Sequence, residues 1–258
     1  MSEQRHNVIW IFGDQHRAQM LGCNGDPNVS TPNIDRLANT GVHFEQAVSG
    51  TPVCCPFRGS LLTGRYPHVC VPDNETPLPD GMPTLAHTFR AEGYHTAYFG
   101  KWHLEGRLKD RNIRHVVPPE RRGGFDTWVG YENNNAQWDT WVHGTGMDEP
   151  RRLPGYETDV MTQLFIEHLE SRAQDSTPFF AALSVQPPHA PYVAPPDWMR
   201  RHTPAVLRSA RMCRPFRASR AWRAANWPAR MPWWRTWTGT WAGSWPRLSR
   251  RGCRTTPT

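Results

Sequence analysis

Residues 7–14 have the sequence NVIWIFGD, a short apolar run with polar residues at both ends. Such a run predicts a strand that is buried on both faces of a parallel sheet. It ends at Gly13 and Asp14, and α/β proteins place their ligand-binding groups beyond the carboxyl ends of their strands. Two further segments have the same character, HTAYFG at 95–100 and FFAALSV at 179–185. The sequence therefore predicts a sheet with functional groups along one edge.

Helical patterns lie between these strands. Residues 31–41 have a proline at the first helical position and a glycine after the end, residues 82–93 also end in glycine, and residues 157–172 are amphipathic. Residues 105–156, rich in Gly, Asn, Pro and Arg, are expected to form a long surface insertion. The alternation of strands and helices predicts an α/β fold with a mostly parallel central sheet flanked by helices.

The charge is divided unevenly along the 258 residues. The chain has a formal net charge of +7, yet the 56 residues from Thr203 onward contain 12 Arg and no Asp, Glu or Lys, so they carry +12 and the preceding part carries −5. The same 56 residues hold seven of the 13 Trp, several prolines and no apolar periodicity. We therefore divide the chain into a domain at 1–200 and an Arg/Trp-rich tail at 201–258 that is expected to be disordered, without a regular fold.

Several classes of protein are excluded by the composition. No apolar run approaches the roughly 18 residues that span a membrane, and no signal peptide precedes the strand predicted at residue 7. The cysteines show neither zinc-binding spacing nor a disulfide framework, and two of them, Cys54 and Cys55, are adjacent. These features predict a cytoplasmic protein.

The predicted strand ends carry Asp14, the pair Lys101 and His103, and His189. A fourth element, CCPFRGSLLTGR at residues 54–65, begins with Cys-x-Pro-x-Arg and continues into a helix predicted at 56–62. A helix amino terminus favours an anion, and an arginine within it adds a fixed charge that holds an oxyanion. Together these segments predict an anion-binding site.

Each of these residues also has a plainer interpretation when it is taken alone. Asp14 resembles a helix cap, Cys54 an inert buried thiol, and His189 an ordinary loop residue. Lys101 and His103 are compatible with unremarkable strand-end positions. It is their joint occurrence that favours a functional site.

Five segments together resemble the sulfatase family, the formylglycine-dependent branch of the alkaline-phosphatase superfamily. They are NVIWIFGDQ (7–15), TPNIDRLANTG (31–41), CCPFRGSLLTGR (54–65), GYHTAYFGKWHL (93–104) and PPHAPY (187–192). The resemblance implies an alkaline-phosphatase-like α/β fold, truncated after about residue 200, and hydrolysis of sulfuric esters. It also implies a small sulfate ester as substrate and a formylglycine-generating enzyme as maturation partner.

The resemblance implies a role for each matching residue. Cys54 would be oxidised to formylglycine, whose hydrated aldehyde supplies the nucleophile, and Arg58 would stabilise that hydrate. Asp14, Gln15 and the modified Cys54 would hold a divalent metal, most often Ca²⁺ in this family. Gln15 stands where many members have a second Asp, which removes one negative charge from the metal site.

The remaining roles concern proton transfer and the sulfate group. Lys101 and His189 would contact sulfate oxygens or protonate the leaving alcohol, and His103 would take the proton whose loss expels sulfate. Phe57 replaces a frequent Ser inside the cysteine motif. The maturation signal depends mainly on Cys, Pro and Arg, so we expect it to survive this change.

The tail departs from the family pattern. Members continue with a second metal motif and a further catalytic Lys, and no acidic residue follows Asp197 to replace them. Trp has a single codon, so each Trp in the tail fixes three nucleotides of the gene. When the codons of residues 231–245 are read in a frame shifted by two nucleotides, the sequence AMVENLDWNVGRIL is permitted, and this peptide resembles a sulfatase helix. We hypothesise a frameshift between about residues 199 and 207, and expect the chain as written to be an inactive or impaired fragment.

Two alternative functions stay open from the sequence. The first is a phosphonate or phosphate monoester hydrolase of the same superfamily, because these esters are also tetrahedral anions. The second is a non-catalytic fragment whose basic tail binds nucleic acid through Arg and Trp, which we do not favour. A membrane partner is not expected.

Overall fold

The structure is a computed structural model that describes residues 5–106 and 112–201. The tail predicted to be frameshifted and irregular, 201–258, lies outside the described residues from position 202 onward. Within the described part, no helix is both long and apolar enough to cross a membrane. Four cysteines in this part are free thiols, at positions 23, 54, 55 and 70.

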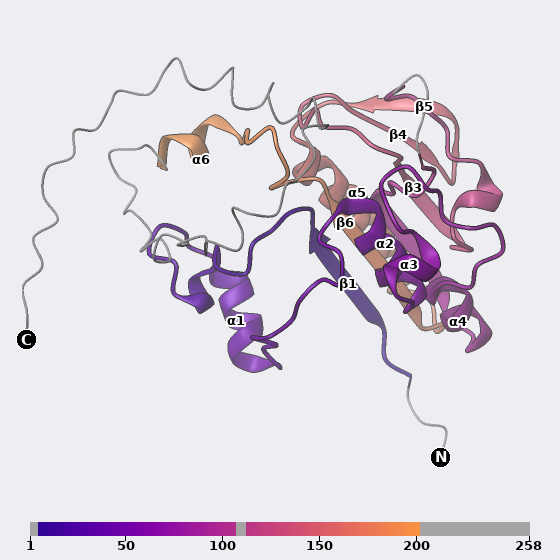
Figure 1. Ribbon diagram of the computed structural model, residues 1–258, viewed down its shortest axis with the longest axis horizontal. Helices are drawn as coiled ribbons and strands as arrows, with labels where there is room; N and C mark the ends of the chain where they lie inside the picture. Colours follow the sequence, from indigo (N-terminus) through magenta and orange to yellow (C-terminus); the bar gives the residue numbers. More distant parts are fainter. Residues whose placement is uncertain (1–4, 107–111, 202–258) are drawn as a thin grey trace, which may run out of the picture. The chain divides into compact units, whose positions relative to one another are not determined.

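The core of the described part is a six-stranded mixed sheet (Figure 1). Its spatial order is β1-β6-β2-β3-β4-β5. The strands are β1 (Val8–Gly13), β2 (His95–Lys101), β3 (Thr127–Tyr131), β4 (Thr140–Gly144), β5 (Met147–Leu153) and β6 (Phe179–Val185). The first four in spatial order are parallel, and β4 and β5 continue the sheet antiparallel. This confirms the predicted mostly parallel α/β sheet.

Helices cover both faces of the sheet. α2 (Cys54–Thr63), α3 (Pro67–Cys70) and α4 (Leu85–Ala91) lie on one face and α5 (Glu157–Arg172) on the other. Two further helices, α1 (Pro32–Thr40) and α6 (Pro196–Arg201), contribute to neither core, and short 3-10 turns lie at Gly22–Asn24 and Pro119–Arg121. Every helix predicted from the sequence is present within a few residues of its expected bounds. The expected surface insertion at 105–156 is wrong, because it supplies β3, β4 and β5 to the sheet.

The alternating side chains of the central strands form two separate cores. On one face, Tyr98 and Phe180 pack with side chains of α2, α3 and α4. On the other face, Phe99 and Leu183 pack with Met161 and its neighbours on α5. Because both faces of β2 and β6 are covered, apolar side chains occupy the middle of both strands, as parallel-sheet strands tend to show, and the polar residues lie toward the strand ends.

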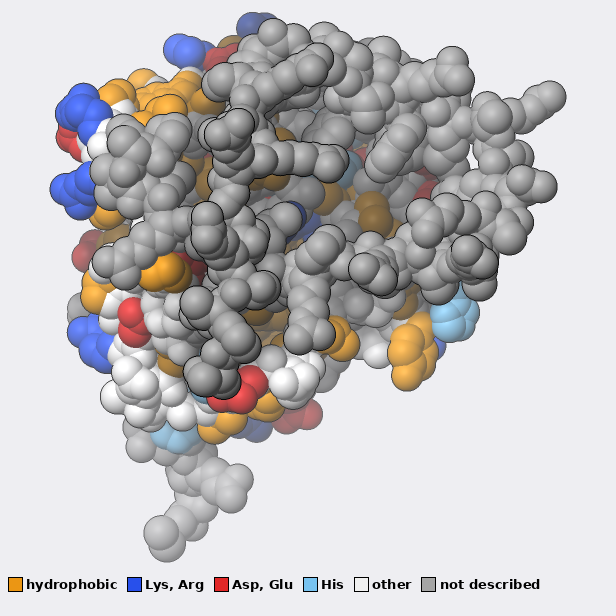
Figure 2. All heavy atoms as spheres, turned by 60° about the vertical axis from the view of Figure 1, so that its left-hand side comes forward, with side chains coloured by type: hydrophobic (Ala, Val, Ile, Leu, Met, Phe, Trp, Pro, Cys, Tyr) orange, Lys and Arg blue, Asp and Glu red, His pale blue; other side chains and the backbone are white. Residues whose placement is uncertain are grey.

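The first strand is not buried on both faces, contrary to the sequence prediction. β1 lies at the edge of the sheet, and Ile9 and Ile11 on one of its faces are 50% and 62% exposed. The cause is that α5 packs mainly over β6 and β2 and not over β1. Other exposed apolar side chains lie on α1 and α6, and Figure 2 shows hydrophobic side chains at the surface among charged ones.

One glycine allows two strands to approach each other beside the site. Gly100 has φ of +103°, and a Cβ there would lie 2.0 Å from the main-chain oxygen of Ser184 on the neighbouring strand. A side chain at this position would force β2 away from β6. Gly100 therefore helps to bring Lys101 close to the end of β6.

Candidate functional site

The site lies at the carboxyl end of the parallel strands, where the sequence placed it. Asp14 follows β1 and continues its ladder, since its N–H donates to the Val185 oxygen at 3.1 Å. Lys101 is the last residue of β2, and His189 lies four residues beyond the end of β6. The amino terminus of α2 brings Cys54 and Arg58 to the same edge.

Asp14 is the centre of a buried cluster of charges. Its Oδ2 accepts a hydrogen bond from Lys101 Nζ at 2.6 Å and from Arg58 Nη2 at 3.3 Å. Burial raises the pKa of Asp14, but the charges of Lys101 and Arg58 outweigh that effect and lower it to about 2. Burial lowers the pKa of Lys101, and Arg58 adds to the fall while Asp14 opposes it. The cluster is therefore one carboxylate held between two cations.

Arg58 is fixed by partners that the sequence analysis did not identify. Its Nη1 donates to Ser184 Oγ at 2.8 Å, to the Lys101 oxygen at 2.7 Å and to the Tyr98 hydroxyl at 3.3 Å. Ser184 also donates to the Lys101 oxygen at 3.0 Å, and so does Tyr98. Ser184 is the one polar residue in the FFAALSV strand, a signal that was available in the sequence.

Cys54 is the first residue of α2, and its thiol faces Asp14. The Sγ atom lies 3.6 Å from each carboxylate oxygen of Asp14. Burial raises the pKa of the Cys54 thiol; Lys101 opposes the rise and Asp14 adds to it. The next residue, Cys55, is fully buried, and its N–H donates to Asn74 Oδ1 at 3.0 Å. Asn74 is a second residue of the site that no sequence pattern pointed to.

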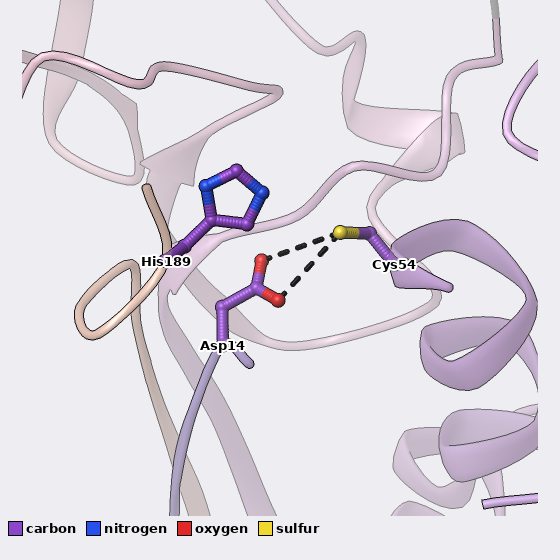
Figure 3. A group of neighbouring side chains, drawn as sticks. All are labelled: Asp14, Cys54 and His189. Carbon is purple, nitrogen blue, oxygen red and sulfur yellow. Dashed lines mark hydrogen bonds between the residues drawn. The ribbon is translucent and has the colours of Figure 1, made fainter. Parts of the chain in front are cut away.

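Asp14, Cys54 and His189 meet closely enough to share a cation. One potential ligand atom from each lies within 4.8 Å of the others, and Figure 3 shows Asp14 between the other two. Asp14 is ionised at neutral pH, which suits a hard cation, but Ca²⁺ takes about six to eight oxygen ligands. Of the three residues only Asp14 offers oxygen ligands, so the described residues supply part of a site for a divalent cation.

The two remaining predicted residues, Gln15 and His103, lie outside the group formed by Asp14, Cys54 and His189. Gln15 follows Asp14 with φ of +64°, and its side chain is exposed and lines a cavity of about 570 Å³ together with Asp14, Cys54 and His189. His103 has φ of +53° and its N–H donates to the Glu132 oxygen at 2.7 Å. Burial lowers the pKa of His103 to about 3, assisted by the charges of Lys101 and Arg58. His103 is therefore neutral at physiological pH.

The charge cluster predicts a pH dependence of stability. Because the pKa of Asp14 falls from its ordinary value of 3.8 to about 2 on folding, its ionised form adds about 2 kcal/mol to stability. This contribution is complete above about pH 4 and is lost as the pH falls through 2. Urea unfolding of Asp14→Asn at several pH values should show a deficit at pH 7 that shrinks progressively below pH 4 and by this full amount only below about pH 2. The exposed control Asp159→Asn should keep the wild-type acid loss.

Comparison with known proteins agrees with this architecture. The model of the sulfatase family matches residues 6–207. The ulvan-active sulfatase of Formosa agariphila is 40% identical over 203 residues, which cover 78% of this chain and 39% of the relative. The crystal structure of the sulfatase-family protein yidJ from Bacteroides fragilis superimposes with a TM-score of 0.70 at 29% identity, covering 78% of this chain and 48% of that one.

A third similar protein is a hydrolase of a different ester class. The phosphonate monoester hydrolase of Agrobacterium radiobacter superimposes with a TM-score of 0.54 at 27% identity, over 78% of this chain and 44% of that one. The chain belongs to the sulfatase family and has its alkaline-phosphatase-like fold. It spans less than half the length of each of the three proteins named here.

Proposed function

We propose that this chain carries the nucleophile-bearing part of a sulfuric-ester hydrolase. The observation that carries the proposal is the position of Cys54, at the start of α2 and 3.6 Å from both oxygens of Asp14. Asp14 in turn contacts Lys101 and Arg58, so two cations lie behind the carboxylate that the thiol faces. A tetrahedral dianion beside Cys54 would be stabilised by those charges.

In this proposal Cys54 acts only after oxidation to formylglycine. Reactive cysteines have a lowered pKa, whereas the pKa of Cys54 is raised, so the unmodified thiol is a poor nucleophile. The hydrated aldehyde would offer two hydroxyl groups at the same place. One loses its proton to solvent and attacks the sulfur of the ester, the S–O bond to the alcohol breaks, and the departing alkoxide takes up a proton from a donor of the site.

Lys101 and His189 would orient the ester and provide that proton. His189 Nδ1 lies 2.6 Å from the Ala190 oxygen, which can only accept, so Nδ1 carries a hydrogen. His189 therefore donates through Nε2 only in its doubly protonated form. Lys101 carries its proton in the ion pair with Asp14. Arg58 holds its charge in place through four hydrogen-bonding partners.

His103 would complete the cycle as a base. Burial lowers its pKa to about 3, so it is neutral at pH 7, and the proposed role as a base requires a higher pKa in the substrate complex, since a general base works best near the operating pH. It would take the proton of the second hydroxyl, which restores the aldehyde C=O bond and expels sulfate from the enzyme. The base and the proton donor are then different residues.

Asp14, Gln15 and the modified Cys54 would hold a divalent cation, for which we propose Ca²⁺. When bound, such an ion offsets the charge of the sulfate and lowers the pKa of a nearby hydroxyl. Asp14 is the one carboxylate in the group that could bind a metal among the described residues. We therefore propose weak metal binding and impaired activity for the chain as written.

The maturation step can be tested directly. Co-expression with a formylglycine-generating enzyme is expected to convert Cys54, detected as an aldehyde by a hydrazide probe and located by peptide mass spectrometry. Cys54→Ala should abolish labelling completely, because alanine lacks the thiol whose replacement turns Cβ into the aldehyde. Cys55→Ala is the matched control and should label as the wild type does.

Labelling that persists in Cys54→Ala would contradict the assignment, and so would an unmodified Cys54 in a folded wild-type chain. The same preparations should bind inorganic sulfate, and the substitution Lys101→Met should lower the affinity for it. Failure of sulfate binding with successful aldehyde formation would place the error in the anion site and leave the maturation step standing.

A second candidate is hydrolysis of phosphonate or phosphate monoesters. The structural similarity to a phosphonate monoester hydrolase favours it, since the same cationic cluster suits either anion. Affinities for inorganic sulfate and methylphosphonate, measured side by side, distinguish the two. Tighter binding of methylphosphonate would favour this second function.

We also propose that the chain is read from a shifted frame beginning between about residues 199 and 207. The support is its composition, with 12 Arg and seven Trp but no acidic residue from Thr203 onward. Sequencing the gene decides the matter. An alternative frame that soon meets stop codons, or that lacks a later Asp-His-Gly-like motif, would refute the proposal.

A further inference from the structure

The connection between β3 and β4 contains three polar side chains that are buried. Glu132, Asn134 and Gln137 are 3%, 6% and 2% exposed. Connecting segments normally direct such side chains to water, because burying a polar group costs free energy unless it forms hydrogen bonds. Here the side chains of Glu132 and Gln137 contact two other loops of the site.

Glu132 holds the turn that follows β2. Its two carboxylate oxygens accept hydrogen bonds from the N–H groups of Leu104 at 3.1 Å and Glu105 at 2.9 Å. Its main-chain oxygen accepts the N–H of His103 at 2.7 Å. Three consecutive N–H groups of this turn therefore bond to one residue. Among the described residues, no salt-bridge partner offsets the Glu132 carboxylate, so these contacts are its principal stabilisation.

The turn needs such support because of its backbone conformation. His103 has φ of +53°, in the left-handed region that residues other than glycine rarely adopt. This conformation is retained only where the surroundings enforce it. The bonds to Glu132 lie directly at and after His103, so they are placed to enforce it.

Gln137 holds the second histidine loop. Its Nε2 donates to the main-chain oxygens of His189 at 3.1 Å and Pro191 at 2.9 Å. An amide nitrogen carries two hydrogens, and both are used on this one loop. The loop also bonds within itself, through the N–H of His189 to Gln186 and the N–H of Val193 to Pro191.

We propose that Glu132 and Gln137 are positioning residues that fix His103 and His189 relative to each other. One short segment, anchored between β3 and β4, thus sets the place of both histidines. The catalytic meaning of this arrangement rests on the proposed function, but the two loop contacts do not. Neither residue contacts the reacting atoms.

Amide hydrogen exchange in the full 258-residue chain tests the proposal. Glu132→Ala is expected to speed exchange at Leu104 and Glu105 by about tenfold or more, the loss expected for bonds to a buried carboxylate. The N–H of His103 bonds to the main chain of residue 132 and should change less. Gln137→Ala should instead speed exchange at His189 and Val193 and leave Leu104 and Glu105 unaffected.

Two further variants make the test specific. Glu132→Gln keeps a single acceptor oxygen, so it should restore protection at only one of Leu104 and Glu105, and it also serves if the alanine variant does not fold. Gln163→Ala removes an exposed glutamine of α5, bonded to Glu167, and should change neither loop. Exchange at Phe99 in the core strand β2 reports any general loss of stability.

Separate loosening of the two loops supports the proposal. Unchanged exchange, or a uniform rise that includes Phe99, overturns it. Inorganic sulfate binding is measured on the same samples, and each alanine variant should weaken it about tenfold. If the wild-type chain binds no sulfate while the loops still loosen separately, the proposed function fails and the positioning of the loops stands.

Discussion

Arg58→Ala is expected to lower the free energy of unfolding by about 3–5 kcal/mol, the cost typical of breaking a buried ion pair from one side. The Arg58 side chain is 2% exposed and donates to Asp14, Ser184, Tyr98 and the Lys101 main chain. Its removal takes one donor from each of these four partners and opens a cavity at the sheet edge, although Lys101 still pairs with Asp14.

Urea unfolding followed by circular dichroism gives the measurement. Arg36→Ala, at an exposed position of α1, is the matched control and should change stability by less than about 0.5 kcal/mol. Arg58→Lys should fall between the two, because it keeps the charge but loses the planar set of donors. A loss below about 1 kcal/mol for Arg58→Ala would mean that the charge cluster contributes little to folding.

The second large effect concerns turnover. The formylglycine-modified chain is expected to hydrolyse an aryl sulfate no faster than the uncatalysed background, although enzymes commonly accelerate such reactions by roughly a millionfold or more. The reason is the donor set: Asp14 is the one carboxylate in the candidate metal group, and no Asp or Glu follows Asp197 in the sequence.

Release of 4-nitrophenol from its sulfate ester, with and without added Ca²⁺, is the measurement. Cys54→Ala is the control for contaminating sulfatases, and chelation of metal is the control for cation dependence. Turnover that is lost in both controls would show that the residues present suffice for catalysis. The shortage of metal ligands would then be refuted as a cause of inactivity.

The sequence predicted most closely those elements whose pattern is unambiguous. α5 and β6 have the expected bounds, because α5 is a long run without Gly or Pro that buries Met161 and Phe165 one turn apart, and β6 is apolar except for Ser184. β3, β4 and β5 were missed because their segments are rich in Gly, Asn, Pro and Arg, and their strand character comes from pairing with β2 and with one another.

Some residues of the candidate site could likewise be predicted from the sequence, and others could not. Asp14, Lys101 and His189 could be predicted because each follows an apolar strand whose carboxyl end is easy to locate. Asn74 could not, because its contact with the N–H of Cys55 joins a loop to a helix end across 19 residues without any local pattern. Glu132 was missed for a related reason, since its segment was interpreted as a surface insertion.

The open side of β1 has a consequence for how the protein behaves in solution. Parallel pairing with β6 satisfies one side of the strand, and the other side has no neighbouring strand in the described sheet. With Ile9 and Ile11 exposed beside that edge, the strand is a template on which another chain can add. Self-association that grows with concentration is therefore to be expected during expression and purification. A charged substitution such as Ile11→Lys should improve solubility without touching the cluster around Asp14.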